Sequence, residues 1–260
     1  MKRKTRWQRR LAGLAAALSL LVIWQIATFF LPPFLLPGIP KTAARLVRLA
    51  GDPAFYQGIE LSLLRLGAGW SIGVLLGAGL GLAAGLSKAF AAYLRSLIAI
   101  LQSIPPITWA PFLIILFGFG NIPIITVVSI ATFFPMALSV MNATEGVSRT
   151  HLELARVMGA SKWQLLTKVY APEAMPAFVT GAQVAFGNAW RSLIAGEMVV
   201  GASKGLGWSI NYAGEVADMA GVLVGIVVIG AVASFIDHVL LEQTKRRLLH
   251  WRNTAGGEAA

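Results

Sequence analysis

The sequence contains no cysteine. Disulfide bonds, thiolate metal sites and cysteine nucleophiles are therefore excluded. Charge is also scarce, since 13% of the 260 residues are charged, whereas soluble domains average about one quarter. The hydrophobic share is 57% and the mean hydropathy is +0.71. A soluble core of this size could not cover that much apolar surface, so the composition indicates an integral membrane protein.

Stretches without a charged residue locate the membrane spans, because a spanning helix needs about 20 apolar residues. Such stretches cover residues 11–40, 66–87, 96–144, 174–190 and 220–236. The stretch 96–144 is long enough for two spans, and Gly118, Gly120, Asn121 and Pro123 mark a turn between them. We therefore expect an all-α polytopic membrane bundle of about six transmembrane helices. The expected helices lie near residues 11–31, 66–86, 95–117, 122–141, 174–196 and 219–241.

The first apolar stretch follows six basic residues within the first ten positions, as a secretory signal would. Its apolar core is too long for a signal peptide, however. Pro32, Pro33 and Phe34 follow it where a cleavage site would have small residues. We interpret this stretch as a membrane anchor.

Basic residues are concentrated in alternate connecting segments, starting with the N-terminus. Lys88, four basic residues in the loop 142–172 and four in the tail 242–260 fall on that side. The opposite side holds Lys41, Arg45, Arg48 and Lys204, with Arg65 at a boundary. Because cytoplasmic loops carry the excess of lysine and arginine, we expect both termini in the cytoplasm. The net charge of +11 is then a consequence of membrane orientation, and no nucleic-acid partner is expected.

Glycines recur at every fourth position of the second expected helix, at Gly69, Gly73, Gly77, Gly81 and Gly85. Glycine is tolerated generally in membrane helices, but five in register favour a groove for close approach of another helix. Two segments, 69–73 and 201–205, also match the pattern of a hydrolase nucleophile elbow. Neither follows a strand, so we expect no enzyme. The chain also lacks a phosphate loop that ends in Gly-Lys-Ser or Gly-Lys-Thr, so it does not bind ATP by that device.

The longest cytoplasmic loop, 142–172, has its own helical signals. Thr150 with Glu153, and Ser161 with Gln164, match the spacing of capping boxes. Gly159 stands where the first short helix would end on a left-handed residue. Ala171 and Pro172 would end the second. A loop with this much order and several apolar residues either packs on its own bundle or docks to a cytosolic protein, and the residues alone favour neither.

One motif in this loop identifies a family. Glu153-Leu154-Ala155, then Gly159, Val169 and Ala171-Pro172 resemble the cytoplasmic signature of bacterial ATP-binding-cassette (ABC) importer permeases. That signature reads Glu-Ala-Ala, three residues, Gly, nine residues, Ile, any residue, Leu-Pro. Leu154 and Ala171 depart from it. The resemblance extends from about residue 59 to 237 and is greatest to the nitrate, sulfonate and taurine branch. Its further matching stretches are Ser62–Arg65, Ser103–Pro106, Ala110-Pro111, Phe117–Gly120, Ala189-Trp190, Glu197-Met198 and Gly205–Gly207.

The resemblance implies a type I importer permease fold in a bacterial inner membrane. Residues 59–241 would form the core transmembrane domain. Residues 1–58 would add the basic N-terminus, the first helix and an outer segment, and 242–260 a basic tail. The loop 142–172 would dock onto a separate ATPase through Glu153, Ala155, Gly159, Ala160 and Ser161. The expected partners are two ATPase subunits, which bind ATP and magnesium, a second copy of this chain, and an extracytoplasmic solute-binding protein. No cofactor is expected in the chain itself.

Polar residues inside the spans are candidates for the translocation pathway, because their burial in lipid is costly. Gln183, Asn188 and Arg191 belong to the fifth expected helix. Arg191 either draws an anion through or pairs with a neighbouring helix. Glu197 lies six residues further on, too far round the helix for a direct pair. Gln102 and Ser103 precede Pro105-Pro106, where the third helix is either broken or, as we slightly favour, only kinked. Arg95 would reach the cytoplasmic interface.

The expected function is the membrane-spanning subunit of an ATP-driven importer for a small anionic solute. The alternative is a stand-alone secondary transporter or channel. The rarity of ionisable residues in the spans and the lack of a detectable inverted repeat disfavour it. An intramembrane enzyme would need a nucleophile and base, which the spans do not supply.

Overall fold

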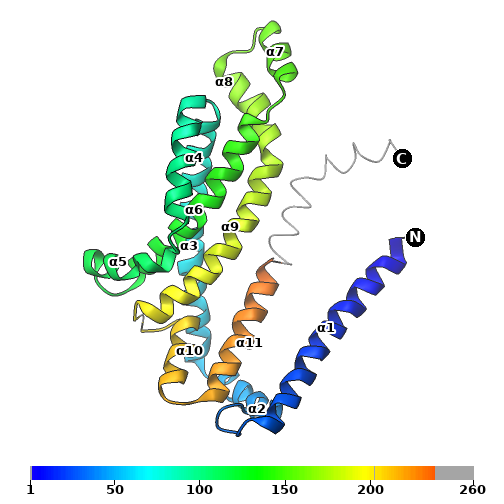
Figure 1. Ribbon diagram of the computed structural model, residues 1–260, viewed down its shortest axis with the longest axis vertical. Helices are drawn as coiled ribbons and strands as arrows, with labels where there is room; N and C mark the ends of the chain where they lie inside the picture. The colour runs from blue at the N-terminus through cyan, green and yellow to red at the C-terminus, as the bar shows by residue number, and fades with distance from the viewer. Residues whose placement is uncertain (1, 202, 238–260) are drawn as a thin grey trace. The chain divides into compact units, whose positions relative to one another are not determined.

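The computed structural model describes residues 2–201 and 203–237, and no strand occurs among them. The positions of Ala202 and of the tail from residue 238 therefore lie outside the described residues. The helices, shown in Figure 1, are α1 (Lys2–Phe30), α2 (Ile39–Ala50), α3 (Pro53–Gly85), α4 (Lys88–Gln102), the 3-10 helix η1 (Pro106–Trp109), α5 (Ala110–Phe117), α6 (Asn121–Glu145), α7 (Arg149–Val157), α8 (Lys162–Leu165), the π-helix η2 (Leu166–Tyr170), α9 (Ala171–Val199), α10 (Leu206–Glu215) and α11 (Met219–Phe235).

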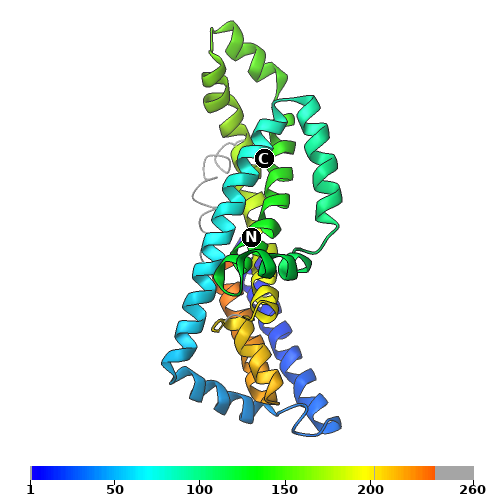
Figure 2. The same cartoon turned by 90° about the vertical axis from the view of Figure 1, so that its left-hand side faces the viewer.

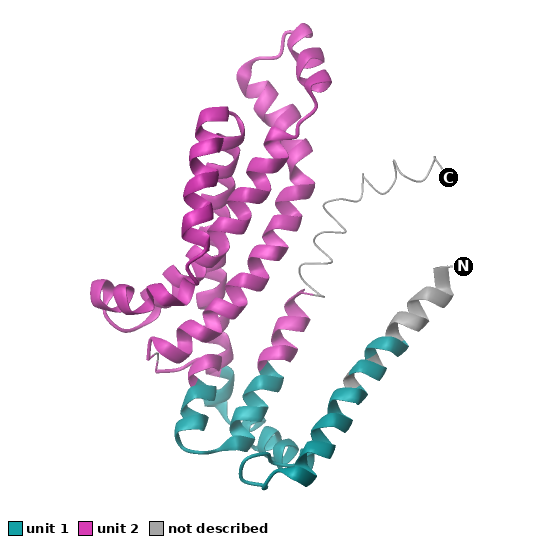
Figure 3. Ribbon diagram, in the orientation of Figure 1, with its two compact units in different colours: residues 1–56, 209–228 teal, residues 57–208, 229–260 magenta. Residues whose placement is uncertain are grey.

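The chain divides into two compact units (Figure 3). One contains residues 1–56 and 209–228, and the other contains residues 57–208 and 229–260. The boundaries cut through α3, α10 and α11 and do not coincide with the expected division at residue 59 and 241. The second unit holds the α6 and α9 pair, the α7–α8 loop and most of the buried residues.

Three of the described helices are long and apolar enough to cross a membrane: residues 11–30 of α1, all of α3, and all of α6. The α4–η1–α5 segment adds a fourth if a broken span is counted, and α11 is apolar but has only 17 residues. At 29 residues α9 is long enough, but Gln183, Asn188 and Arg191 interrupt its apolar sequence. Each of the six expected apolar segments thus lies in a helical region as far as it is described, since residues 238–241 of the sixth lie outside the described residues.

The third expected helix is broken, not kinked. Between α4 and α5 the chain passes through Ser103, Ile104 and Pro105 into η1, and the axis bends by 81°. Two adjacent prolines remove two backbone donors, so the α-helical ladder cannot continue through them. In Figure 2 the two arms of this bend run in clearly different directions. The slight preference for a kink at this position was therefore wrong.

The glycines of α3 bring this helix into close contact with α6 in the larger unit. A Cβ atom built on any of Gly69, Gly73, Gly77, Gly81 or Gly85 would lie 2.4–2.8 Å from an atom of α6. At Gly81 that atom is the backbone oxygen of Ala137, which has no rotamer by which to move aside. Gly67 and Gly79, on the other side of α3, would meet nothing within 4 Å. The fourfold spacing therefore lets the backbones of α3 and α6 approach directly.

The smaller unit is held by polar contacts near its turns. Trp24 Nε1 donates to Pro37 O at 3.1 Å. Arg45 of α2 pairs with Asp218, between α10 and α11, at 2.7 Å. Burial raises the pKa of the Asp218 carboxyl, but the Gly221 N–H and the Arg45 guanidinium lower it more, so the net pKa lies below its ordinary value. A carboxyl with a lowered pKa stabilises the fold at neutral pH and loses this effect only as the pH falls through its folded pKa.

Valine at position 81 tests the contact between α3 and α6. We expect Gly81→Val to destabilise the protein by about 1–3 kcal/mol or to prevent its accumulation, because the new side chain overpacks against a backbone. Thermal unfolding in detergent and membrane yield measure both. The matched control is Gly79→Val, on the same helix in open space. Similar behaviour of the two variants would contradict the assigned contact.

Candidate functional site

The α7–α8 loop is closed by a Schellman motif. The N–H of Ala160 donates to Ala155 O at 3.0 Å, and the N–H of Gly159 donates to Arg156 O at 2.9 Å. These are the two hydrogen bonds that define the motif. In this motif the residue just after the helix cap, here Gly159, has a left-handed backbone conformation. Gly159 has φ of +80°, a region that side chains rarely enter. The prediction that the first short helix ends at Gly159 is confirmed.

The two expected capping boxes have different outcomes. Ser161 accepts from Gln164 N–H, while the Gln164 side chain accepts from Ser161 N–H, so the second box is confirmed. The first is wrong: α7 begins at Arg149, and Thr150 lies inside its first turn. Ser148 is the N-cap residue and makes no side-chain cap. Its N–H instead donates to Glu173 at 3.2 Å, and His151 contacts the same carboxylate.

Pro172 does not interrupt the helix that follows the loop. The chain passes from α8 through η2 into α9, and Tyr170 and Ala171 both keep α-helical backbone angles. In a π-helix the backbone hydrogen bonds join residues i and i+5. The backbone hydrogen-bond pattern has therefore already changed just before Pro172, which has no N–H to donate. The expectation that Ala171 and Pro172 end a separate helix is therefore wrong, and the loop is continuous with α9.

The tip of this loop is apolar and exposed. Glu153, Gly159 and Ser161 are all exposed, and Ala155 and Ala160 are half-buried. The large apolar side chains around them are exposed by 59–86%, namely Leu154, Val157, Met158 and Trp163. In Figure 1 the α7–α8 segment extends past the end of α4. Side chains this exposed do not pack on the loop's own bundle, so this surface fits docking to another protein better.

A buried ion pair lies at the other end of α9. Arg65 Nη1 and Glu197 Oε1 are 2.6 Å apart, and their side chains are exposed by 3% and 0%. Ser62 also donates to the Glu197 carboxylate, at 2.8 Å. Arg65 further donates to Asn121 Oδ1 and Lys204 O, each at 2.8 Å. We name these five residues the Arg65–Glu197 cluster.

The cluster also caps α10. The N–H of Leu206 donates to Ser62 Oγ and the N–H of Gly207 to Glu197 Oε2, each at 2.9 Å. These are the first two N–H groups of α10, which have no partner inside their own helix. A Cβ on Gly205 would lie 2.5 Å from Glu197 Cδ, and one on Gly207 would lie 2.4 Å from Ile194 O. Only glycine fits at both positions.

Three separate sequence motifs therefore meet in one place. Ser62 and Arg65 come from the first, Glu197 from the second, and Gly205 and Gly207 from the third. Sequence reasoning put Arg65 at the edge of an outer segment, but it lies within α3 and is buried. It also placed Glu197 among the pathway candidates, whereas the structure uses its carboxylate entirely for internal contacts. Arg65 and Ser62 were missed as site residues, although their four-residue motif was recognised.

The remaining pathway candidates lie apart from this cluster. Arg191 is exposed on α9 and donates to Asn188 Oδ1 at 2.6 Å. Gln183, two turns earlier, is half-buried. Gln102 and Ser103 are exposed at the break after α4, where Ser103 Oγ donates to Ala99 O at 2.9 Å. Arg95 pairs with Glu145 at 2.8 Å. Arg191 and Glu197 do not pair, as their spacing predicts.

The bundle of long apolar helices, the exposed helical loop at one end and the buried charge cluster at the other define the chain as the membrane component of a transport system. The chain belongs to the family of binding-protein-dependent transport system inner membrane components, whose model matches residues 73–248.

Several known permease proteins are similar to this chain over most of their length. The taurine transport system permease protein TauC of Escherichia coli is 32% identical, over 90% of this chain and 87% of that protein. The putative aliphatic sulfonates transport permease protein SsuC of Bacillus subtilis is 31% identical, over 76% of this chain and 71% of that protein. The bicarbonate transport system permease protein CmpB of Synechococcus elongatus is 29% identical, over 89% of this chain and 88% of that protein.

A solved structure supports the fold. The inward-facing MetNI methionine ABC transporter matches with a TM-score of 0.66 and 20% sequence identity, covering 75% of this chain and 96% of the other. The expected type I importer permease fold is thereby confirmed.

Removing one charge of the Arg65–Glu197 pair tests how much the cluster contributes to the stability of the fold. Glu197→Gln should lower the unfolding free energy by about 3–5 kcal/mol, because it leaves a buried cation without a counter-charge. Adding Arg65→Met should recover part of that loss. Chemical unfolding in detergent measures both variants. The control, Arg95→Met, breaks an exposed pair with Glu145 and should cost no more than about 1 kcal/mol. Equal losses in the two single variants would contradict the assigned role.

Proposed function

We propose that this chain forms the translocation pathway of an ATP-driven importer for a small anion, and that its α7–α8 loop docks onto a separate ATPase subunit. The exposed apolar tip held by the Schellman motif at Gly159 carries this proposal. The structure of the tip is fixed by hydrogen bonds of its own, so the tip is formed before any partner binds. ATP and its magnesium ion bind to the partner, which performs the hydrolysis.

Open space around Gly159 supports docking at this position. A Cβ built there would meet nothing within 4 Å in this subunit. The glycine is therefore required by its backbone angles and not by packing within this subunit, which leaves room at this position for a partner. Glu153 lies on α7 six residues before Gly159 and is exposed. It supplies a carboxylate for a basic group on the ATPase.

The working assembly is proposed as two copies of this chain with two ATPase subunits. Each copy contributes one loop, so two copies present two docking surfaces. A solute-binding protein would deliver the solute from outside, as the family's description of a binding-protein-dependent system implies. The bias of basic residues supports an orientation with both termini and the α7–α8 loop in the cytoplasm.

The solute is proposed to be a small anion that passes Arg191. Among the described residues no carboxylate lies within 4 Å of this guanidinium, which donates to the neutral amide oxygen of Asn188. An exposed arginine in a spanning helix is costly in lipid, which favours a position on a water-filled path. The similar permeases named for taurine, aliphatic sulfonates and bicarbonate have solutes with an anionic group.

The docking role of the loop is tested by Gly159→Asp. We expect this variant to lose ATPase co-purification and transport while it remains inserted and folded, because the new side chain enters the interface. Glu153→Ala should weaken assembly less, since it removes contacts without adding a clash. Membrane level, co-purified ATPase and solute-stimulated hydrolysis are measured for each variant.

The matched control is Gly118→Asp. Gly118 has φ of +75° and ψ of −178° and also meets nothing within 4 Å, so aspartate is strained there at least as much as at Gly159, but the position lies far from the loop in sequence. This variant should keep the ATPase. If Gly159→Asp retains both the ATPase and transport, the loop is not the docking element.

The anion pathway is tested by Arg191→Gln and Arg191→Lys. The neutral variant should reduce uptake of a sulfonate at least about ten-fold, which corresponds to about 1.4 kcal/mol of lost interaction. The lysine variant keeps the charge and should retain more activity. Uptake by proteoliposomes is compared with ATPase co-purification, which neither variant should change. If Arg191→Gln retains full uptake, Arg191 is not part of the translocation pathway.

A further inference from the structure

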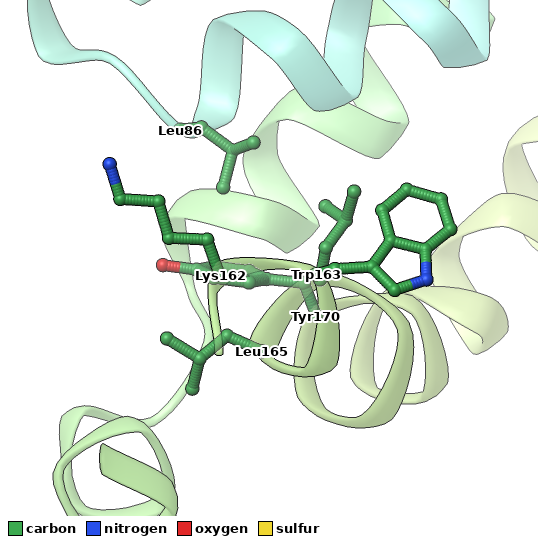
Figure 4. A pocket seen from close by; sticks show the side chains of 6 residues that line it. Leu86, Lys162, Trp163, Leu165 and Tyr170 are labelled. Carbon is green, nitrogen blue, oxygen red and sulfur yellow. The ribbon is translucent and has the colours of Figure 1, made fainter. Parts of the chain in front are cut away.

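A cavity of about 500 Å³ lies between the end of α3 and the segment formed by α8 and η2. Its volume falls within the range of about 300–1,000 Å³ that is typical of small-ligand sites. The lining is predominantly apolar, with one basic residue. Its residues are Leu86, Lys162, Trp163, Leu165, Leu166 and Tyr170. In Figure 4 the stem of Lys162 and the ring of Trp163 lie on either side of Leu86.

The π-helix contributes to the shape of this cavity. Leu166 and Tyr170 are the first and last residues of η2, and both line it. Lys162, Leu166 and Tyr170 are spaced four residues apart, which places them on one face of a helical segment. A π-turn widens the helix and shifts the side chains that follow it, and such turns recur at functional sites. The widened turn therefore belongs to the wall of the cavity.

The position of the cavity is set by α3. This helix is long and apolar enough to cross a membrane, and it ends at Gly85, one residue before Leu86. If α3 is a membrane span, the cavity lies at the end of that span. Tryptophan and tyrosine are enriched at that depth, and a lysine there keeps its ammonium group near the phosphate layer while its stem covers apolar surface. Trp163 is exposed by 71% and Leu86 by 49%, so the mouth of the cavity is apolar.

We propose that this cavity binds an acyl chain of an anionic phospholipid, with the Lys162 ammonium group at the lipid phosphate. Among the described residues no carboxylate lies within 4 Å of Lys162. Of the residues at the exposed tip Trp163 lines the cavity, whereas Glu153 and Gly159, which carry the proposed ATPase contact, do not. The combination of an apolar cavity and one free cation at a membrane boundary matches a lipid tail and its head group.

The consequence is a second support for the α7–α8 loop. Ser161 caps α8 and lies two residues after Gly159, so whatever fills the cavity touches the helix that follows the turn. A bound lipid would fix the distance between this turn and the membrane surface.

The experiment uses the permease with its ATPase subunits in phosphatidylcholine nanodiscs. One sample contains a trace of photoactivatable phosphatidylglycerol, and a parallel sample contains photoactivatable phosphatidylcholine. After irradiation, the labelled peptides are mapped by mass spectrometry. We expect segment 162–170 to be labelled about five-fold more by phosphatidylglycerol, the factor that corresponds to one lysine near an anionic surface.

Three variants make the assignment specific. Lys162→Gln should reduce phosphatidylglycerol labelling to the phosphatidylcholine level. Lys168→Gln, in the same helical segment but outside the lining, should leave it unchanged. Leu166→Trp should fill the cavity and lower labelling by both lipids.

Two results would overturn the proposal. The first is equal labelling by the two lipids in the unmodified protein. The second is loss of the ATPase by Leu166→Trp together with unchanged lipid labelling of Lys162→Gln, which would assign the cavity to a side chain of the ATPase. Both readouts are independent of transport, so they hold whatever solute the importer carries.

Discussion

The Arg65–Glu197 pair is the interaction that sets the geometry of the larger unit. Two charges withdrawn from water need each other and further hydrogen bonds, because an uncompensated charge in a protein interior costs several kcal/mol. Ser62, Asn121, the carbonyl of Lys204 and the first N–H groups of α10 provide those bonds. A shift of α3 by one turn would break most of them together. The pair therefore fixes the register of α3 against α9.

The α9 helix joins this cluster to the α7–α8 loop. Glu173 holds the start of α7 through Ser148 and His151, and Glu197 lies 24 residues further along the same helix. At about 1.5 Å per residue the two carboxylates are separated by roughly 36 Å of helix. Because α9 is continuous over this length, with Pro176 in its second turn, the loop and the cluster lie at the two ends of one helix.

Patterns that depend on local chemistry were predictable from the sequence, and patterns that depend on distant partners were not. The fourfold glycine spacing, the left-handed Gly159 and the Ser161 capping box each follow from a few neighbouring residues. The true N-cap at Ser148 could not be found in this way, since its hydrogen-bond partner is 25 residues away. The burial of Arg65 could not be predicted for the same reason, since its partner Glu197 is 132 residues away. The break after Ser103 was signalled by two prolines, but sequence does not tell how far a chain bends at them.

The burial of Arg65 has a consequence for how the protein is made. Its partner Glu197 lies 132 residues later in the chain, so α3 leaves the ribosome with a charged group that nothing yet neutralises. An arginine near the centre of a spanning helix opposes membrane insertion by about 2.5–3.5 kcal/mol, although a position nearer the helix end reduces this. The favourable insertion free energy of the apolar remainder of α3 must outweigh this cost of inserting Arg65 until α9 is synthesised. The bundle can thus be completed only after α9 has been synthesised. In a chain truncated before α9, Arg65 would have no counter-charge, and the chain would be a target of membrane quality-control proteases.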